Sequence, residues 1–337
     1  MKARRVLIAS IAAAALALTG CASGADEPGT SGAQVTFEKK NPLKIGYSTY
    51  DLQSPYWQAY TKGIKDEGAA QKIEIVVADQ KSSEQNQVSG SADLINQGIS
   101  ALIITPVQPP ALPATITAAH NAKIPIIVAD IGAEGDYDAF ILSDNRAGGA
   151  LAAKEIESKL AAKSGTKKVG VIELHSGSAV GDDRVGGFKD EIAKNKDFEI
   201  VASLDGNDTV EGGFKAAQDM LAANPDLDAI YAANDPSAQG AARALQAAGK
   251  SLSSGFVLVG FNGDDPSLDL IKSGEQSATI AQDPYGQGRL AVKTAIALLD
   301  GKDAGFSNAE KRVIEFPVTV VNSDNLESFR AERAKQG

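Results

Sequence analysis

Short apolar runs alternate with helical patterns along most of the chain, and this alternation restricts the fold more than any other feature. In the first half, five runs bounded by turn residues are predicted to be buried strands: 44–47, 73–78, 101–105, 125–129 and 140–142. Two helical patterns lie between them: Trp57, Tyr60 and Ile64, and Val88, Ala92 and Ile95. Strands that alternate with helices indicate parallel sheets with helices on both faces.

The pattern starts again in the second half of the chain. A second strand series is predicted at 169–173, 200–204, 229–233, 257–261 and 278–281. Helices are predicted at 184–194, 214–223, 237–248 and 285–300, followed by an extended run at 312–321. The sequence therefore predicts two α/β units of similar size. Ligands of open α/β sheets bind outside the carboxyl ends of the strands, so the site is expected in a cleft between the two units.

The first twenty residues have the composition of a secretory signal peptide. Three basic residues within the first five precede an apolar run from Val6 to Leu18, which is too short to span a bilayer comfortably. The run ends in Leu18-Thr19-Gly20-Cys21, which is similar to a lipobox. We expect a signal peptide at 1–20, then a lipidated Cys21 and a flexible tether over 21–41. The alternative is a free cysteine beside an ordinary cleavage site.

Charge and composition exclude several classes of protein. The formal net charge of the chain is −10, so a general affinity for nucleic acid or anionic lipid is not expected. A chain with one Cys cannot build an internal disulfide framework, and two His leave little for a zinc site. We therefore expect no metal and no cofactor, and contact with the membrane only through the lipid anchor.

Polar side chains stand where the predicted strands end. These residues are Ser48, Asp130, Asn234, Asn262 and Gln282, and Arg184 is expected to open a helix after the 169–173 strand. Each of them alone could be a helix cap or a turn residue. Because a polar residue directly follows several predicted strands, we expect these side chains to surround a ligand. Carboxylate, amides and one guanidinium suit a neutral polyhydroxylated molecule, whose hydroxyls both donate and accept.

Tyr56 and Trp57 follow the first strand at a predicted helix start. An aromatic ring is the natural partner of the flat C–H face of a sugar, so both are candidates for stacking on the ligand. The alternative is that both rings belong to the core of an amphipathic helix, with Trp57 packed against Tyr60 and Ile64.

Several segments together resemble the ribose-binding-protein group of periplasmic sugar-binding proteins. The resemblance covers about 43–321 and rests on motifs in one order: Lys44-Ile45-Gly46-Tyr47-Ser48-Thr49, Pro55-Tyr56-Trp57, Ile124-Pro125-Ile126-Ile127-Val128-Ala129-Asp130, Ser143-Asp144-Asn145, Arg184-Val185-Gly186-Gly187-Phe188, Ala233-Asn234-Asp235, Val259-Gly260-Phe261-Asn262-Gly263 and Ala278-Thr279-Ile280-Ala281-Gln282.

The resemblance implies a type I periplasmic binding protein fold, with two doubly wound parallel-sheet lobes joined by a three-stranded hinge. The lobes would be 42–143 plus 283–318, and 144–282 plus 319–337, with crossings near Ser143, Gln282 and Val318. It implies a monomeric receptor that closes on a monosaccharide and delivers it to the permease subunits of an ABC importer. By position, it assigns the ligand contacts to Ser48, Tyr56, Trp57, Asp130, Arg184, Asn234, Asn262 and Gln282.

Three departures from the pattern of this group make ribose itself doubtful. Ile131 stands where ribose binders have a second arginine, and Asn262 stands where an aspartate is usual. Asn207 and Asp208 occupy the place of an aromatic ring, and the sequence does not decide whether either contacts the ligand. The loss of one cation and one anion favours another pentose, a deoxy sugar or a linear polyol.

Other functions remain as alternatives. A sensor partner in place of a transport partner fits the same sequence. A sugar-processing enzyme would use Asp130 and Asp235 as an acid–base pair. No catalytic residue is assigned, because 244–251 and 286–291 match phosphate-loop and dinucleotide patterns only loosely, and the sequence shows no evident acid to orient His175 beside Ser176. A transcriptional regulator of this fold would carry a DNA-binding helix-turn-helix in place of a signal sequence.

Overall fold

The computed structural model describes residues 36–132 and 134–336. The predicted signal peptide, the predicted lipidation site Cys21 and the predicted tether up to residue 35 lie outside the described residues. The end of the predicted tether range contacts the folded part of the chain. Phe37 packs against the apolar core, Lys39 pairs with Asp300, and the backbone N–H of Glu38 donates to the Lys123 carbonyl. Contacts with the fold therefore begin before residue 42.

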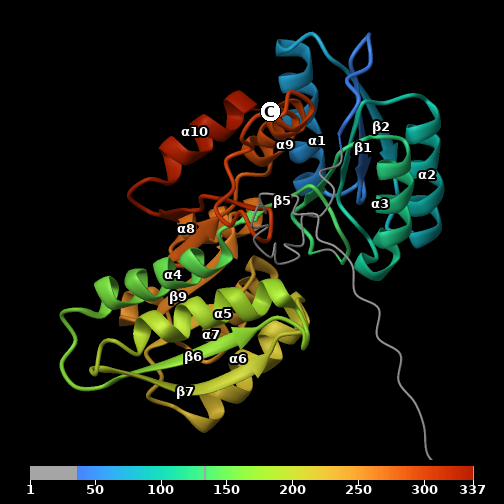
Figure 1. Ribbon diagram of the computed structural model, residues 1–337. Coiled ribbons are helices and arrows are strands. Elements are labelled where there is room, and N and C mark those ends of the chain that lie inside the picture. Colours follow the sequence, from blue (N-terminus) through green and yellow to red (C-terminus); the bar gives the residue numbers. More distant parts are fainter. Residues whose placement is uncertain (1–35, 133, 337) are drawn as a thin grey trace, which may run out of the picture. The chain divides into compact units, whose positions relative to one another are not determined.

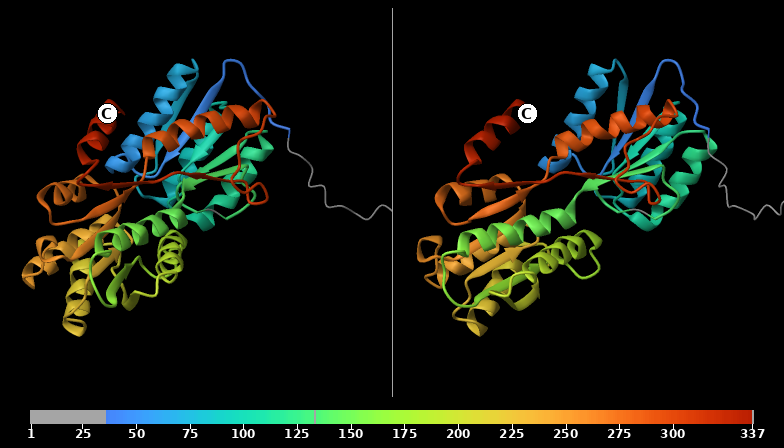
Figure 2. Two further views of the ribbon diagram at one scale, coloured as in Figure 1. Left: turned by 90° about the vertical axis from the view of Figure 1, so that its left-hand side faces the viewer. Right: turned by 60° about the vertical axis from the view of Figure 1, so that its left-hand side comes forward.

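The first sheet has six parallel strands in the order β11-β5-β4-β3-β1-β2. Its strands are β1 (Lys44–Thr49), β2 (Glu74–Asp79), β3 (Ala101–Ile104), β4 (Ile126–Ala129), β5 (Ala139–Ser143) and β11 (Val313–Phe316). Its helices are α1 (Pro55–Ala70), α2 (Glu84–Asn96), α3 (Leu112–Asn121) and α9 (Pro284–Leu299). Helix α9 lies beside α1, although more than two hundred residues separate them in sequence (Figure 2).

The second sheet also has six strands, in the order β12-β10-β9-β8-β6-β7, and only its edge strand β12 runs antiparallel. Its strands are β6 (Lys167–Glu173), β7 (Phe198–Asp205), β8 (Ala229–Ala232), β9 (Val257–Asn262), β10 (Ala278–Ala281) and β12 (Thr319–Asn322). The helices that follow them in the chain are α4 (Asn145–Leu160), α5 (Ala179–Ile192), α6 (Val210–Ala223), α7 (Asp235–Ala247), α8 (Asp265–Ser273) and α10 (Leu326–Gln336). Figure 1 shows helices flanking the strands of both sheets. The predicted α/β fold with two parallel sheets is confirmed.

The central strands are apolar on both faces because helices cover both sides of each sheet. In β3, Ile103 packs into the core shared with α1 and α9, whereas Leu102 and Ile104 pack into a second core shared with α2 and α3. All three side chains are fully buried. A continuous apolar run of this kind is the sequence pattern of a parallel strand rather than of a half-exposed one.

The chain passes between the sheets three times. It leaves the first sheet after β5 to enter α4, returns between β10 and α9, and crosses again between β11 and β12. These crossings place Ser143 and Gln282 at the ends of strands from different sheets. No helix of the described residues is both long and apolar enough to cross a membrane.

Two local predictions were wrong. Helix α5 begins at Ala179, after the capping residue Ser178, so Arg184 lies in its second turn and does not open the helix. In α2, Val88 is 44% exposed, and the buried face carries Gln87, Ser91 and Leu94. The apolar spacing predicted the wrong buried face because α2 buries two polar side chains. Gln87 hydrogen-bonds to the Gln108 backbone, and Ser91 hydrogen-bonds to Ser48.

Candidate functional site

Tyr56 and Asp130 are joined by a hydrogen bond across the first sheet. Tyr56 is the second residue of α1, behind Pro55, and its hydroxyl donates to Asp130 Oδ1 over 2.7 Å. Asp130 follows β4 directly and has a φ of +63°, in the left-handed region that non-glycine residues seldom adopt. Burial raises the pKa of the Asp130 carboxyl, while the Tyr56 hydroxyl and the Arg184 charge lower it. Strained backbone at a strand end, held by a side-chain hydrogen bond, is typical of functional sites.

Gln282 links this pair to the second sheet. Its Oε1 accepts from Ser143 Oγ over 2.7 Å and lies 3.4 Å from the Tyr56 hydroxyl. Its Nε2 donates to Asn262 Oδ1 over 2.9 Å, and its backbone N–H donates to the Asn262 carbonyl over 3.0 Å. The amide of Gln282 is therefore held on both sides by residues at the ends of strands.

Arg184 is buried, with 5% of its surface exposed, and is held by several acceptors. Its Nε donates to Asn145 Oδ1 over 2.9 Å, and its Nη1 donates to the Ala233 carbonyl over 2.9 Å and to Asn262 Oδ1 over 3.3 Å. The guanidinium carbon lies 3.8 Å from the centre of the Phe261 ring, a favourable cation–π distance. Burial lowers the pKa of Arg184, but an arginine remains protonated in proteins.

Asp130 and Arg184 are two partly or fully buried opposite charges that form no salt bridge within 4 Å to any described residue. Each is surrounded instead by neutral hydrogen-bonding groups. A buried charge is costly unless other groups hydrogen-bond to it. An arrangement of this kind can accept a neutral, hydrogen-bonding molecule without adding net charge to the site.

The structure places two of the predicted contacts, Ser48 and Trp57, outside this cluster. Ser48 is fully buried, and its Oγ accepts from Gln80 Nε2 over 2.9 Å, on the α2 side of the sheet. Trp57 is 8% exposed and belongs to the first core, stacked on Tyr50 with ring centres 5.8 Å apart. The Trp57 and Tyr56 rings pack nearly perpendicular to each other, with ring centres 4.7 Å apart, so Trp57 contacts and supports the Tyr56 ring.

Asn234 serves as the N-cap of α7, and its Oδ1 accepts from the Ser237 N–H over 2.9 Å. It follows Ala233, whose carbonyl holds Arg184, so it stands at the edge of the cluster. Its Nδ2 makes no hydrogen bond within the described part of the chain, which leaves a donor beside Arg184. The cap interpretation and the ligand interpretation are therefore compatible.

The sequence analysis did not single out Ser143, Asn145 and Gln287. Ser143 donates to Gln282, and Gln287 Nε2 donates to Ser143 Oγ over 3.0 Å. Asn145 orients Arg184 and donates from Nδ2 to the Ser143 carbonyl over 3.0 Å. Gln287 is fully buried, and its Oε1 has no hydrogen-bond partner among the residues that the structure describes. Ser143 and Asn145 belong to the Ser143-Asp144-Asn145 motif of the family resemblance. Their position beside a predicted crossing between the lobes could have marked them as site residues.

Asp208, whose role the sequence left undecided, accepts from the His175 backbone N–H over 2.9 Å and pairs with the His175 ring. Asp208 has a φ of +57°. The imidazole is therefore oriented by an acid, but no hydroxyl group of the described part of the chain is hydrogen-bonded to it. Within the described residues, no group of three or more His, Cys, Asp or Glu side chains is placed to hold a metal ion.

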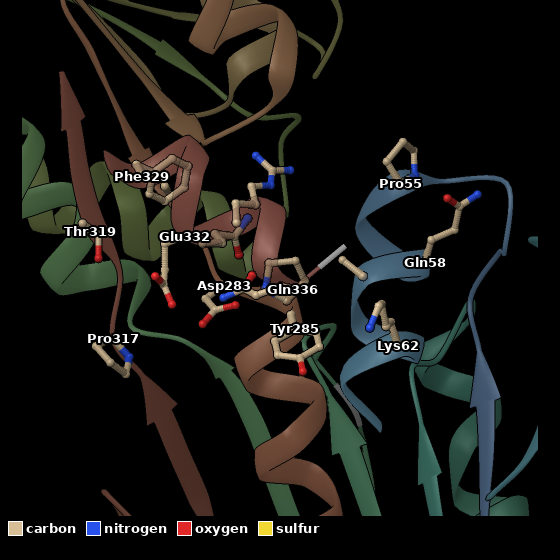
Figure 3. A pocket seen from close by; sticks show the side chains of 15 residues that line it. Pro55, Gln58, Lys62, Asp283, Tyr285, Pro317, Thr319, Phe329, Glu332 and Gln336 are labelled. Atoms are coloured by element: carbon tan, nitrogen blue, oxygen red, sulfur yellow. The ribbon is translucent and has the colours of Figure 1, made fainter. Parts of the chain in front are cut away.

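A cavity of about 510 Å³ lies next to the cluster and shares Gln282 with it (Figure 3). Its walls come from α1, from the start of α9 and from α10, which contribute Lys62, Tyr285 and Arg333 among others. Figure 3 shows Lys62 and Gln58 on one side and Phe329 and Glu332 on the other. None of the other residues predicted to contact the ligand lines this cavity, so we do not assign the ligand to it.

Comparisons with known proteins agree with this arrangement. A family model for the periplasmic binding protein domain matches residues 45–303. The chain is similar to the ribose import binding protein RbsB of Bacillus subtilis, with 31% identity over 264 residues that cover 78% of this chain and 84% of the relative. Its similarity to RbsB of Escherichia coli is 34% over 266 residues, covering 78% and 86%.

A solved structure also resembles the chain. An ABC transporter solute-binding protein from Mycobacterium smegmatis with bound glycerol superposes with a TM-score of 0.69 and 30% identity, covering 85% of this chain and 96% of that one. The matches cover most of each relative, and they are binding proteins rather than enzymes. The chain therefore belongs to the periplasmic binding protein family, within the ribose-binding-protein group of sugar-binding proteins that serve ABC transporters.

Proposed function

We propose that this protein captures a neutral monosaccharide or polyol at the cluster formed by Tyr56, Asp130, Arg184, Asn262 and Gln282. The observation that carries the proposal is the set of hydrogen bonds Tyr56–Asp130, Arg184–Asn262 and Gln282–Asn262, with Gln282 Oε1 lying 3.4 Å from the Tyr56 hydroxyl. Asp130 and Gln282 Oε1 offer acceptors, and Arg184 offers donors that point toward the same region. A polyhydroxylated ligand satisfies both kinds of group, because each hydroxyl donates once and accepts twice.

The Tyr56 ring is the stacking surface in this proposal. It is held from behind by Trp57 and fixed at its hydroxyl by Asp130. Burial and the Asp130 charge raise the pKa of Tyr56 well above its ordinary value, so its hydroxyl remains a donor at neutral pH. A rigid ring loses little entropy when a sugar face packs against it.

Binding in this proposal closes two lobes, 42–143 plus 283–318 and 144–282 plus 319–337, on the ligand. Tyr56 and Asp130 come from the first sheet, whereas Arg184 and Asn262 come from the second. A ligand that contacts both sets stabilises the arrangement in which they face each other. The closed, monomeric receptor is then recognised by the permease subunits of an ABC importer.

Asn262 narrows the ligand class. Its Oδ1 already accepts from Arg184 and Gln282, so only its Nδ2 group, which also lies against the Asp264 carboxyl and lowers the pKa of that carboxyl, is left to face a ligand. An aspartate at this position would present an acceptor and a negative charge instead. We therefore expect a ligand that places an acceptor oxygen near Asn262 and needs no second cation, since Ile131 follows Asp130.

The relatives suggest which ligands to test. Proteins named for ribose, allose and xylitol are 26–34% identical to this chain, and the similar solved structure holds glycerol. A thermal-shift screen should therefore include D-ribose, D-allose, L-arabinose, xylitol, myo-inositol and glycerol. A ligand that binds only the folded state raises Tm. If none of these raises Tm, the proposed ligand class is wrong.

Export and lipid anchoring complete the proposal and rest on the sequence alone. The single Cys of the chain follows the apolar run and the Leu18-Thr19-Gly20 segment, where a lipobox requires it. We expect the protein at the outer face of the cytoplasmic membrane, held by a lipid on Cys21. Cys21→Ala should release the protein or leave an unprocessed precursor. A variant that is processed normally and still sediments with membranes would contradict the anchor.

A further inference from the structure

Asp235 is a fully buried carboxylate whose three contacts are all neutral donors. It is the first residue of α7, directly after the N-cap Asn234. Its Oδ2 accepts from the backbone N–H groups of Gly263 and Asp264, each over 2.8 Å, and its Oδ1 accepts from Thr279 Oγ1 over 2.8 Å. No cation lies within 4 Å of it among the described residues. Burying a carboxylate without a cation costs free energy. This cost points to a role in fixing the groups that donate to it.

The backbone of the second sheet leaves room for this carboxylate. A Cβ on Gly260 would lie 2.2 Å from Asp235 Oδ1, so a side chain at this point of β9 would displace the carboxylate. Gly263 has a φ of +81°, which favours glycine there as well. The Asp235 carboxylate thus accounts for Gly260, whereas the positive φ and the nearby Ala281 account for Gly263.

The segment that Asp235 holds is the one that carries Asn262. Asn262 precedes Gly263 and has a φ of +138°, a conformation that side-chain-bearing residues rarely adopt. In this conformation its Oδ1 lies between Arg184 Nη1 and Gln282 Nε2, and its carbonyl accepts from the Gln282 backbone N–H. Among the described residues, the side-chain hydrogen bonds of Asp235 go to Gly263, Asp264 and Thr279 and not to Asn262. Its influence on the cluster passes through the Gly263 and Asp264 backbone.

Helix α10 holds the same turn from the other end. Arg333 Nη1 donates to the Gly263 carbonyl, and the Phe329 ring lies next to Gly263. The N–H of Gly263 is therefore fixed by α7 and its C=O by α10. A turn held at both ends can keep the strained Asn262 backbone in place before any ligand arrives.

We propose that Asp235 is a positioning residue for ligand binding, which fixes Asn262 and Gln282 in their binding geometry through the Gly263–Asp264 backbone. The predicted effect of Asp235 on ligand affinity rests on the proposed function. Its predicted effect on the Gly263–Asp264 turn is independent of that function. The positioning role also replaces the glycosidase alternative, because the carboxylate oxygens of Asp235 are occupied by three donors and are not directed at a substrate.

The test is a double-mutant cycle on binding, measured by calorimetry with D-ribose and with xylitol as probes. Asp235→Asn is isosteric but turns an N–H₂ group toward backbone N–H donors. In the wild-type background it should weaken binding at least about tenfold. In the Asn262→Ala background it should weaken binding clearly less than in the wild-type background, because the Asn262 side chain is gone and only the effect through Gln282 remains. Equal losses in both backgrounds would overturn the proposal.

Asp228→Asn is the matched control. Asp228 is also a buried carboxylate of the second sheet, and it accepts from the Lys168 backbone N–H at the opposite end of the strands. Its substitution should leave the affinity within about twofold of wild type. Thr279→Val is the second variant, in case Asp235→Asn does not fold. It removes one donor to Asp235 and should weaken binding by about threefold to tenfold.

Amide hydrogen exchange provides a measurement that needs no ligand. Asp235→Asn should speed exchange at Gly263 and Asp264 at least about tenfold relative to the Ser277 amide, which donates to Leu258 in the same sheet. If Asp235→Asn changes the exchange rates of Gly263 and Asp264 no more than that of Ser277, Asp235 does not hold the turn. If neither probe binds the wild-type protein while exchange changes as expected, the fault lies in the proposed function and not in the role of Asp235.

Discussion

Tyr56 donates a 2.7 Å hydrogen bond to Asp130, and this bond ties the first turn of α1 to the end of β4. It fixes an aromatic ring and a carboxylate at the same edge of the first sheet. The two residues are separated by 74 positions in sequence, so the sheet order alone brings them together.

Tyr56→Phe should weaken ligand binding about tenfold, because Asp130 loses its donor and its carboxylate is no longer oriented. The pKa of Asp130 should rise further, since the Tyr56 hydroxyl lowers it. Calorimetry with the best sugar of the thermal-shift panel measures the loss. Tyr60→Phe is the matched control, because the buried Tyr60 hydroxyl has no hydrogen-bond partner within residues 36–132 and 134–336. If the two variants bind equally well, the hydroxyl of Tyr56 has no role in the site.

Arg184→Lys should lose most of the binding although the charge is kept. A lysine has one nitrogen and cannot reach Asn145 Oδ1 and the Ala233 carbonyl together, nor can it lie flat on Phe261. We expect a loss of about 1.5–3 kcal/mol in unfolding free energy and at least about tenfold in affinity. Urea unfolding and calorimetry measure the two effects. Arg146→Lys, at an exposed arginine, should change neither. A fully active Arg184→Lys would mean that only the charge matters.

Trp57 should report little of the binding event. Its ring is packed among Tyr50, Tyr56 and Tyr60 and is only 8% exposed, so a ligand can screen little of it from water. We expect the tryptophan emission and its quenching by iodide to stay nearly constant when a confirmed ligand is added. Trp57→Phe should instead lower the unfolding free energy by about 1–3 kcal/mol. A large change in emission that saturates with the binding constant would place Trp57 in the site after all.

Stability should fall as the pH rises toward 7, in part because of Asp235. Burial raises the pKa of Asp235 to about 7, with a further rise from the Asp264 charge, against the effect of its three donors. Because this folded-state pKa lies above the unfolded value of about 3.9, the folded protein keeps a proton that the unfolded chain releases. The contribution is complete below about pH 4 and is lost as the pH rises through about 7.

Urea unfolding at several pH values tests this sign. Asp235→Asn does not titrate, so its unfolding free energy should fall less steeply between pH 5 and 7, by up to about 1.4 kcal/mol per pH unit. The other charged groups near Asp235 remain in the variant, namely Asp264, Arg184 and Arg333. Parallel curves for wild type and variant would contradict the raised pKa.

The strand–helix alternation was sufficient to predict both sheets, because buried parallel strands are apolar on both faces. It was not sufficient for helices that bury small or polar residues. Helix α4 packs against α5 through Gly149, where a Cβ would lie 2.0 Å from the Arg184 carbonyl, and glycines give no apolar signal. In α2, Gln87 and Ser91 are buried because they find hydrogen-bond partners, which a count of apolar residues cannot show.

Polar residues that directly follow predicted strands indicated the candidate site better than the spacing of residues within the predicted helices did. The strand-end rule grouped Asp130, Asn262 and Gln282, and the structure brings them into one cluster because carboxyl ends of parallel strands meet at one edge; their contact with a ligand stays a prediction. The same rule misplaced Ser48, because the side chain of a strand's residue can turn toward the helix layer instead of the edge. Gln287 could not be found by that rule, because it lies inside α9 and reaches Ser143 only through the crossing of the chain.

The most direct test of the central claim is calorimetry of wild type and Asp130→Asn with D-ribose, D-allose, L-arabinose, xylitol, myo-inositol and glycerol. Asp130→Asn keeps the shape of the side chain but replaces one acceptor oxygen with a donor. The wild type should bind at least one of these ligands with a stoichiometry of one. Asp130→Asn should weaken that binding at least about tenfold, while Ser48→Ala leaves it unchanged. Equal affinity for wild type and Asp130→Asn, or binding of none of the six, would contradict the account.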